Sequence, residues 1–240
     1  MINLLISLLA GVVVALAVLL GSSFGWVAAV VPGLVAAAAV YVLASRRTFK
    51  RLEALFEEAQ KEIMAQKLDK AIRTLEAGFA LGPWQFLVRS QIHSQIGVLE
   101  YVRQEFDAAL PHLEKSFSRH WLARAMLATS RYRKRDLDGA VKVFEEAVKA
   151  NKKEGLLWAV YAWCLDKEGR HGEAVAVMGR AAKANPSDEK VKAVLQSLQN
   201  DKKLKLGKVY EEQWFQFHLE RMPPEMAGPR GGRRVIYQRR

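Results

Sequence analysis

The first part of the chain is apolar and uncharged, and the pattern changes abruptly at Arg46, the first charged side chain. Two apolar runs, residues 2–20 and 26–44, are separated by the sequence GSSFG. Each run has about the 20 residues that a helix needs to cross about 30 Å of hydrocarbon. Glycine and serine between the runs are typical of a turn, so residues 1–45 are predicted to form a two-helix transmembrane hairpin. A cleaved signal peptide is the alternative for the first run, although the sequence MIN supplies no positively charged start.

Basic residues follow the second apolar run directly, in the juxtamembrane segment 46–51. They are Arg46, Arg47, Lys50 and Arg51. Basic residues beside a membrane span stay on the cytoplasmic side and attract anionic lipid headgroups. We therefore expect an integral membrane protein, in a membrane of the bacterial inner-membrane type, with both termini and all of the later chain in the cytoplasm. The lone Cys164 agrees with a reducing compartment.

From residue 52 onward, apolar side chains recur every three or four positions, which predicts helices. Within this part, small residues recur in four sets, each with gaps of twelve and then seven positions. The sets are Ala59, Ala71, Gly78; Gly97, Ala109, Ser116; Ala128, Ala140, Ala147; and Ala162, Ala174, Ala181. Two antiparallel helices approach closely where both carry small side chains, and the third small residue admits the next pair. The spacing therefore predicts repeated helical hairpins.

The last set has Trp158 before it, Gly169 in the expected turn and Pro186 after the second helix. These residues resemble the tetratricopeptide repeat, a helix–turn–helix unit of about 34 residues. The resemblance implies four units over residues 52–188, at about 52–85, 90–120, 121–154 and 155–188. The predicted fold class is all-α, an N-terminal transmembrane hairpin followed by an α-solenoid.

Two further segments follow the predicted repeats. Residues 189–220 are expected to supply a capping helix that begins after Ser187 or Asp188, and then an aromatic helix over 204–220. Residues 221–240 contain proline, glycine and arginine and predict an extended basic tail. The tail adds candidate contacts with the membrane or a partner: Arg230, Arg233, Arg234, Arg239 and Arg240.

Candidate catalytic chemistry is sparse. No histidine stands beside another ligand at a zinc spacing, and the sequence has no phosphate-binding glycine loop and no nucleophile elbow. We expect no enzyme activity, no metal and no cofactor. His171 lies where the other units have Leu68, Phe106 and Leu137. It is interpreted as a turn residue, and the change from an apolar side chain to histidine is left without a reason.

The resemblance implies a groove, lined by the first helix of each unit, that binds a protein partner. Its lining positions, taken from the spacing, are Ser94, Tyr101, Thr129, Tyr132, Arg133, Trp163, Asp166 and Lys167. The net charge of +12 does not favour nucleic acid, because the basic clusters are scattered and no nucleic-acid module is present. A small-molecule substrate is not expected either. The expected function is a membrane-anchored scaffold or adaptor for protein partners, and the alternative is an accessory subunit of a larger membrane complex.

Overall fold

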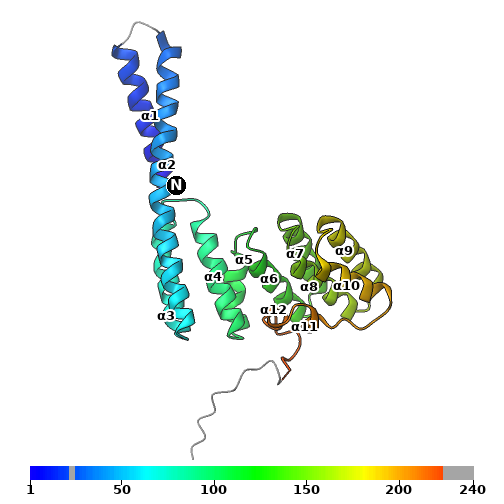
Figure 1. The fold of residues 1–240 in the computed structure, drawn as a ribbon. Helices are drawn as coiled ribbons and strands as arrows, with labels where there is room; N and C mark the ends of the chain where they lie inside the picture. Colours follow the sequence, from blue (N-terminus) through cyan, green and yellow to red (C-terminus); the bar gives the residue numbers. More distant parts are fainter. Residues whose placement is uncertain (22–24, 224–240) are drawn as a thin grey trace, which may run out of the picture. The chain divides into compact units, whose positions relative to one another are not determined.

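The structure, a computed structural model, describes residues 1–21 and 25–223. These residues form helices and no strands, which confirms the predicted all-α class (Figure 1). The chain divides into two compact units, Met1–Ala123 and Arg124–Arg240. Residues 22–24 of the expected hairpin turn and the five tail arginines expected to contact the membrane or a partner, residues 230–240, lie outside the described residues.

The first unit begins with two long helices that lie side by side, α1 (Ile2–Gly21) and α2 (Gly25–Met64) (Figure 1). They approach closely at two glycines, since a Cβ atom added to Gly11 would lie 2.7 Å from the carbonyl oxygen of Gly33. A Cβ atom on Gly33 would in turn lie 2.8 Å from the carbonyl oxygen of Gly11. Any side chain at these positions would therefore push the two helices apart.

Most of the surface of this helix pair is apolar and uncovered. Only 11% of the most apolar stretch of each helix is buried, whereas the core helix of a soluble protein is mostly buried. Leu9, Leu20 and Trp26 are among the most exposed apolar side chains. Both helices are long and apolar enough to cross a membrane, and α1 has the composition of a signal sequence as well.

Helix α2 does not end with the apolar run. It continues through the basic segment 46–51 as far as Met64, so its second part forms the start of the helical array. This part packs against α3 (Leu68–Ala77) through Leu52, Ala59, Ala71 and Leu75, which are all buried. The apolar hairpin and the first packed helix pair therefore share one continuous helix.

Most of the remaining helices pack in pairs of consecutive helices, such as α4 (Val88–Val102) with α5 (Phe106–Glu114) and α8 (Gly155–Lys167) with α9 (His171–Ala184). In the first unit the remaining helices are η1 (Gly78–Leu81), α4 and α5. Helix α6 (Trp121–Arg133) begins at the end of the first unit and continues into the second, which contains α7 (Leu137–Ala150), α8, α9 and α10 (Glu189–Gln199).

The small residues of the sequence pattern lie at contacts between paired helices. Ala109, Ala140 and Ala174 are fully buried. A Cβ atom on Gly97 of α4 would lie 2.9 Å from Cδ2 of Leu113 in α5. These contacts confirm the physical reason for small side chains at these positions, although Ser116 is only half-buried.

The turn between paired helices repeats one geometry. Its residue with positive φ lies five positions before the central alanine of each set, and these residues are Gln66, Gln104, Arg135 and Gly169. The following amide donates a hydrogen bond to the carbonyl five residues earlier, as from Glu105 N to Glu100 O at 2.9 Å and from Arg170 N to Leu165 O at 2.9 Å. This is the Schellman arrangement, which ends a helix with one left-handed residue.

Helix α10 follows the last pair. The Asp188 side chain caps it by accepting hydrogen bonds from the amides of Lys190 and Val191, and Val191, Val194 and Leu198 are buried. It ends in the same kind of turn, with Asp201 at φ 50°.

The single aromatic helix expected over 204–220 is wrong. Two short helices lie there instead, α11 (Leu206–Val209) and α12 (Glu212–Phe215). The backbone of Glu211 has φ 53°, which interrupts the helix between them. The aromatic side chains of this segment pack inward, with Trp214 and Phe217 fully buried.

Candidate interaction surfaces

In the first unit, the start of α1 is attached to the loop that follows η1. The amide of Ile2 donates to the carbonyl of Pro83 at 2.9 Å, and the amide of Asn3 donates to the carbonyl of Trp84 at 3.2 Å. Carbonyl groups of the loop thus satisfy amides that the first turn of a helix leaves without internal acceptors.

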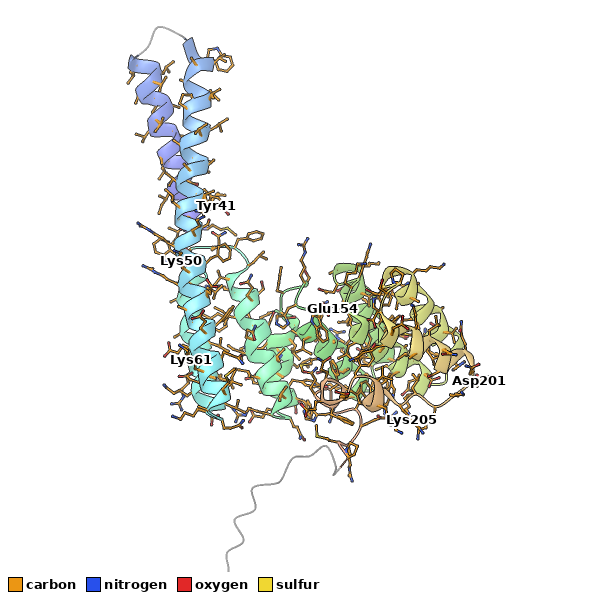
Figure 2. All side chains as sticks on the ribbon, viewed as in Figure 1. Tyr41, Lys50, Lys61, Glu154, Asp201 and Lys205 are labelled. Atoms are coloured by element: carbon orange, nitrogen blue, oxygen red, sulfur yellow. The ribbon has the colours of Figure 1, made fainter. Side chains whose placement is uncertain are left out.

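A network of polar side chains reinforces this junction. The Asn3 side-chain amide donates to Thr48 Oγ1 at 3.0 Å and to Gln85 Oε1 at 3.3 Å. Ser45 Oγ donates to the same Gln85 oxygen at 3.3 Å, and Gln85 Nε2 donates to the Tyr41 hydroxyl at 3.1 Å. All except Tyr41 are buried. Figure 2 labels Tyr41 on α2, at the level where the loop meets the helix pair.

The sequence reading missed this junction. Gln85 was predicted only as the end of the first repeat unit, at about 52–85, and its partners lie 40 or more positions away along the chain. A local signal does exist, because Asn3 lies at the start of the first apolar run and Ser45 and Thr48 follow the end of the second, and these two ends meet in a helical hairpin.

The four basic residues of segment 46–51 all lie on α2 with exposed side chains. Figure 2 shows Lys50 extending outward from this helix. Within the described part of the chain, none of the four is engaged in an ion pair. They are therefore available for an anionic partner at the junction.

Two expected groove residues of the first unit are buried instead. Ser94 Oγ donates to the Ser90 carbonyl at 2.7 Å and accepts from the Phe117 amide at 2.8 Å. The Tyr101 ring lies edge-on to Phe106 at 5.0 Å. Both side chains are completely inaccessible. Ser94 and Tyr101 were expected to line an open groove, and this expectation is wrong. Both side chains instead hold neighbouring helices and loops together.

In the second unit, Thr129 and Trp163 are also buried rather than open to a groove. Thr129 Oγ1 donates to the Met126 carbonyl of its own helix at 3.0 Å. Trp163 lies between Tyr132 at 6.2 Å and Trp214 at 5.3 Å, both in edge-on geometry. Residues 204–218, called here the C-terminal segment, therefore cover the Trp163 face of α8.

The other expected groove residues border this covered face. Arg133 Nη1 donates to the His218 carbonyl at 3.1 Å, and Lys167 Nζ lies 5.2 Å from the Trp163 ring centre. Tyr132 is half-buried, and burial raises the pKa of its hydroxyl. Among the residues that the structure describes, the buried Trp163 indole nitrogen has no hydrogen-bond acceptor. A buried N–H group without an acceptor costs free energy, and the carbonyl group of a bound partner could supply that acceptor.

Asp166 has a different role from the one expected, and it explains His171. Nδ1 of His171, the first residue of α9, lies 2.7 Å from Asp166 Oδ1 of α8. Its Nε2 lies 3.2 Å from Oδ1 of Asp201, which follows α10 and is labelled in Figure 2. The hydrogen bond to Asp166 is the main cause of a raised His171 pKa. Histidine replaces an apolar residue here because it connects two carboxylates.

Over the described residues, no three histidine, cysteine or acidic side chains gather as metal ligands would. Nδ1 of His93 and Nδ1 of His112 lie 3.1 Å apart, and burial is the main cause that lowers the pKa of His93 to about 4. Cys164 is buried, and burial raises the pKa of its thiol. A thiol of this kind is mainly protonated and poorly nucleophilic.

Comparison with known proteins agrees with the resemblance. Residues 131–198 match the family described as tetratricopeptide repeat. This stretch includes α7, α8 and α9 and nearly all of α10. No curated protein matches the chain. The match covers less than a third of the chain, and the helix pairs within residues 131–198 are similar to tetratricopeptide repeats.

Proposed function

We propose that this tetratricopeptide-repeat protein is a membrane-anchored scaffold, which holds protein partners at the cytoplasmic face of a membrane. Confinement to a surface raises the effective concentration of a binder for partners that are held on the same surface. The protein would then act by recruitment rather than by turnover.

The continuity of α2 carries this proposal. One helix of 40 residues includes an apolar, uncovered first part and a second part that packs against α3. A flexible linker would leave the array free to rotate away from its anchor, whereas a helix transmits orientation. The packed helices of the first unit would therefore stand at a defined angle to the membrane.

Contacts of α1 favour a retained hairpin over a cleaved signal sequence. Its glycine contact with Gly33 and the hydrogen bonds of Asn3 to Thr48 and Gln85 would all be lost by cleavage. The buried side chain of Gln85 would then lack one of its partners, which is costly. Basic residues 46–51 favour the cytoplasm for the later chain.

Reporter fusions test the anchor and its orientation. A reporter that is active only in the cytoplasm, fused after Arg240, should be active, and a reporter that needs the periplasm should be inactive. The same fusions to a chain without residues 1–45 provide the control for membrane attachment. The reverse pattern of activities in the full chain would reject the orientation.

For the partner surface, we propose the part of the second unit around Arg133 and Lys167. Both side chains are exposed at the edge of the C-terminal segment. A partner peptide would compete with this segment and bring an acceptor to the Trp163 indole nitrogen. Arginine, tyrosine and tryptophan together are common anchors of protein interfaces.

Photo-crosslinking in native membranes tests this surface. A photoreactive residue at Lys167 should capture a distinct protein, whereas the same residue at Lys149, an exposed position of α7, should not. Capture from Lys149 alone would move the interface to another face. If the photoreactive residue at position 167 crosslinks only to the C-terminal segment of the same chain, a partner at this surface would be contradicted.

One observation supports the alternative function, an accessory subunit of a larger membrane complex. The apolar sides of α1 and α2 that face away from each other are exposed, as at Leu9 and Leu34, and could pack against other membrane helices. Purification in mild detergent distinguishes the two functions. A membrane protein recovered in a fixed ratio would support the subunit, and soluble partners alone would support the scaffold.

A further inference from the structure

We propose that an anionic phospholipid binds in the cavity between the start of α1, α2 and the loop after η1. This inference deepens the proposed function and rests on the membrane anchoring in it. The cavity has a volume of about 450 Å³, enough for a headgroup and the first acyl carbons but not for a whole lipid. The lining residues used here are Ile6, Val40, Leu43, Arg47, Arg51 and Trp84.

The wall that α2 contributes changes from apolar to cationic along one face. Val40, Leu43, Arg47 and Arg51 follow one another at spacings of three or four residues, so they lie on the same side of the helix. Between Val40 and Arg51 the helix rises by about 16 Å, at about 1.5 Å per residue. A phospholipid has the same order, with acyl chains at one end and the phosphate at the other.

The cationic end of the cavity lacks any compensating charge. No acidic side chain lines the cavity, and within the described residues neither Arg47 nor Arg51 forms an ion pair. Arginine binds phosphate oxygens through two parallel N–H donors. The site therefore suits an anionic headgroup better than a neutral lipid or an acyl chain alone.

The depth of the cavity agrees with a headgroup position. The hydrogen bonds from Gln85 to Tyr41 and from Ser45 to Gln85 hold the loop beside residues 41–45 of α2, where the apolar run ends. Trp84 lines the cavity and is 39% exposed. Tryptophan is enriched at membrane interfaces because its ring is apolar and its N–H group is polar.

The same features select a lipid over a soluble phosphate. Ile6, Val40 and Leu43 form an apolar half that a free phosphate would leave empty, and the side chain of Ile6 is 44% exposed. Burial of acyl carbons against these side chains would add to the attraction of the two arginines.

Native mass spectrometry of the full chain, released from vesicles that contain phosphatidylglycerol and phosphatidylcholine, tests the site. The wild type should retain phosphatidylglycerol in preference to phosphatidylcholine. The double variant Arg47→Gln/Arg51→Gln should retain about 25-fold less phosphatidylglycerol, since each arginine in contact with the headgroup contributes on the order of a fivefold gain. Arg46→Gln/Lys50→Gln removes the same charge from α2 outside this cavity, where the side chains do not contact the bound headgroup, and should change retention of the lipid much less, by about twofold or less.

The outcomes separate the site from its alternatives. Equal losses in the two double variants would indicate general attraction to the surface and overturn the proposal. Displacement of the lipid by soluble glycerol phosphate would identify a free-phosphate site and also overturn it. All variants should remain in the membrane fraction after alkaline washing, because the hairpin is intact. Loss of the wild type from that fraction would instead contradict the anchoring on which the inference rests.

Discussion

At the scale of single residues, His171 connects three helices of the second unit. Its ring lies between Asp166 at the end of α8 and Asp201 after α10, while the residue itself begins α9. Both charged groups that face it are acidic, and both raise its pKa above the usual 6.5. The protonated ring is therefore stabilised in the folded protein relative to the unfolded chain.

The variant His171→Leu restores the apolar residue type of the other units. Its loss of stability relative to the wild type should depend on pH. Because the folded pKa is raised, the stabilisation is complete below about pH 6.5 and is lost as the pH rises through the folded pKa. The melting temperature of the wild type should exceed that of the variant at pH 5.5, and the difference should shrink by pH 9. Asp201→Asn should show part of the same effect. A difference that stays constant with pH would exclude the ion pair as its cause.

At the scale of elements, the turn between paired helices needs one left-handed residue. Only Gly169 among the four is a glycine, and the others are Gln66, Gln104 and Arg135. A side chain in this conformation costs about 1–2 kcal/mol because Cβ approaches a backbone oxygen. Three of the four turns therefore keep a strain that a single substitution could remove.

The variant Gln104→Gly should stabilise the first unit by about 0.5–1 kcal/mol, after the larger chain entropy of glycine in the unfolded state is subtracted. Gln104→Ala is the matched control, because it removes the side chain but keeps Cβ. Urea unfolding of the detergent-solubilised chain, followed by circular dichroism, measures both. Equal midpoints for the glycine and alanine variants would mean that the turn is not strained.

At the scale of the whole molecule, residues near both ends of the described chain contact segments that are distant in sequence. In the first unit, Ile2 and Asn3 bond to the loop at Pro83 and Trp84. In the second unit, Trp214 is fully buried against Trp163, and its indole N–H donates to Glu220 at 2.9 Å. The C-terminal segment therefore serves as a cover for the last repeat helices.

Trp214→Ala should lower the free energy of unfolding of the second unit by about 3–5 kcal/mol, because a large buried ring leaves a cavity. Met222→Ala, at a side chain that is 40% exposed, should change it by less than about 0.5 kcal/mol. Circular dichroism is the suitable probe, since the substitution itself alters tryptophan fluorescence. A loss below about 1 kcal/mol for Trp214→Ala would show that the segment is only loosely attached.

The sequence by itself determined the features that depend on local periodicity. Apolar runs of membrane length, small residues such as Ala109 and Ala174, and a helix N-cap at Ser187 or Asp188 could all be recognised because a helix places its neighbours at fixed spacings. Spacing also identified which side of the first helix in each unit was expected to line the groove. It could not show which other segments cover that side. For this reason Ser94, Tyr101, Thr129 and Trp163 were expected to be open and are buried.

Only the tertiary structure decided the contacts between residues far apart in the chain. The Gln85 network joins three segments, and the C-terminal segment folds back onto Trp163 although its aromatic pattern suggested one regular helix. Likewise, the left-handed turns at Gln66, Gln104 and Arg135 follow from the packing of the paired helices, since these side chains disfavour that conformation. Local preference is worth only about 1 kcal/mol per residue, so long-range burial overrules it wherever the two conflict.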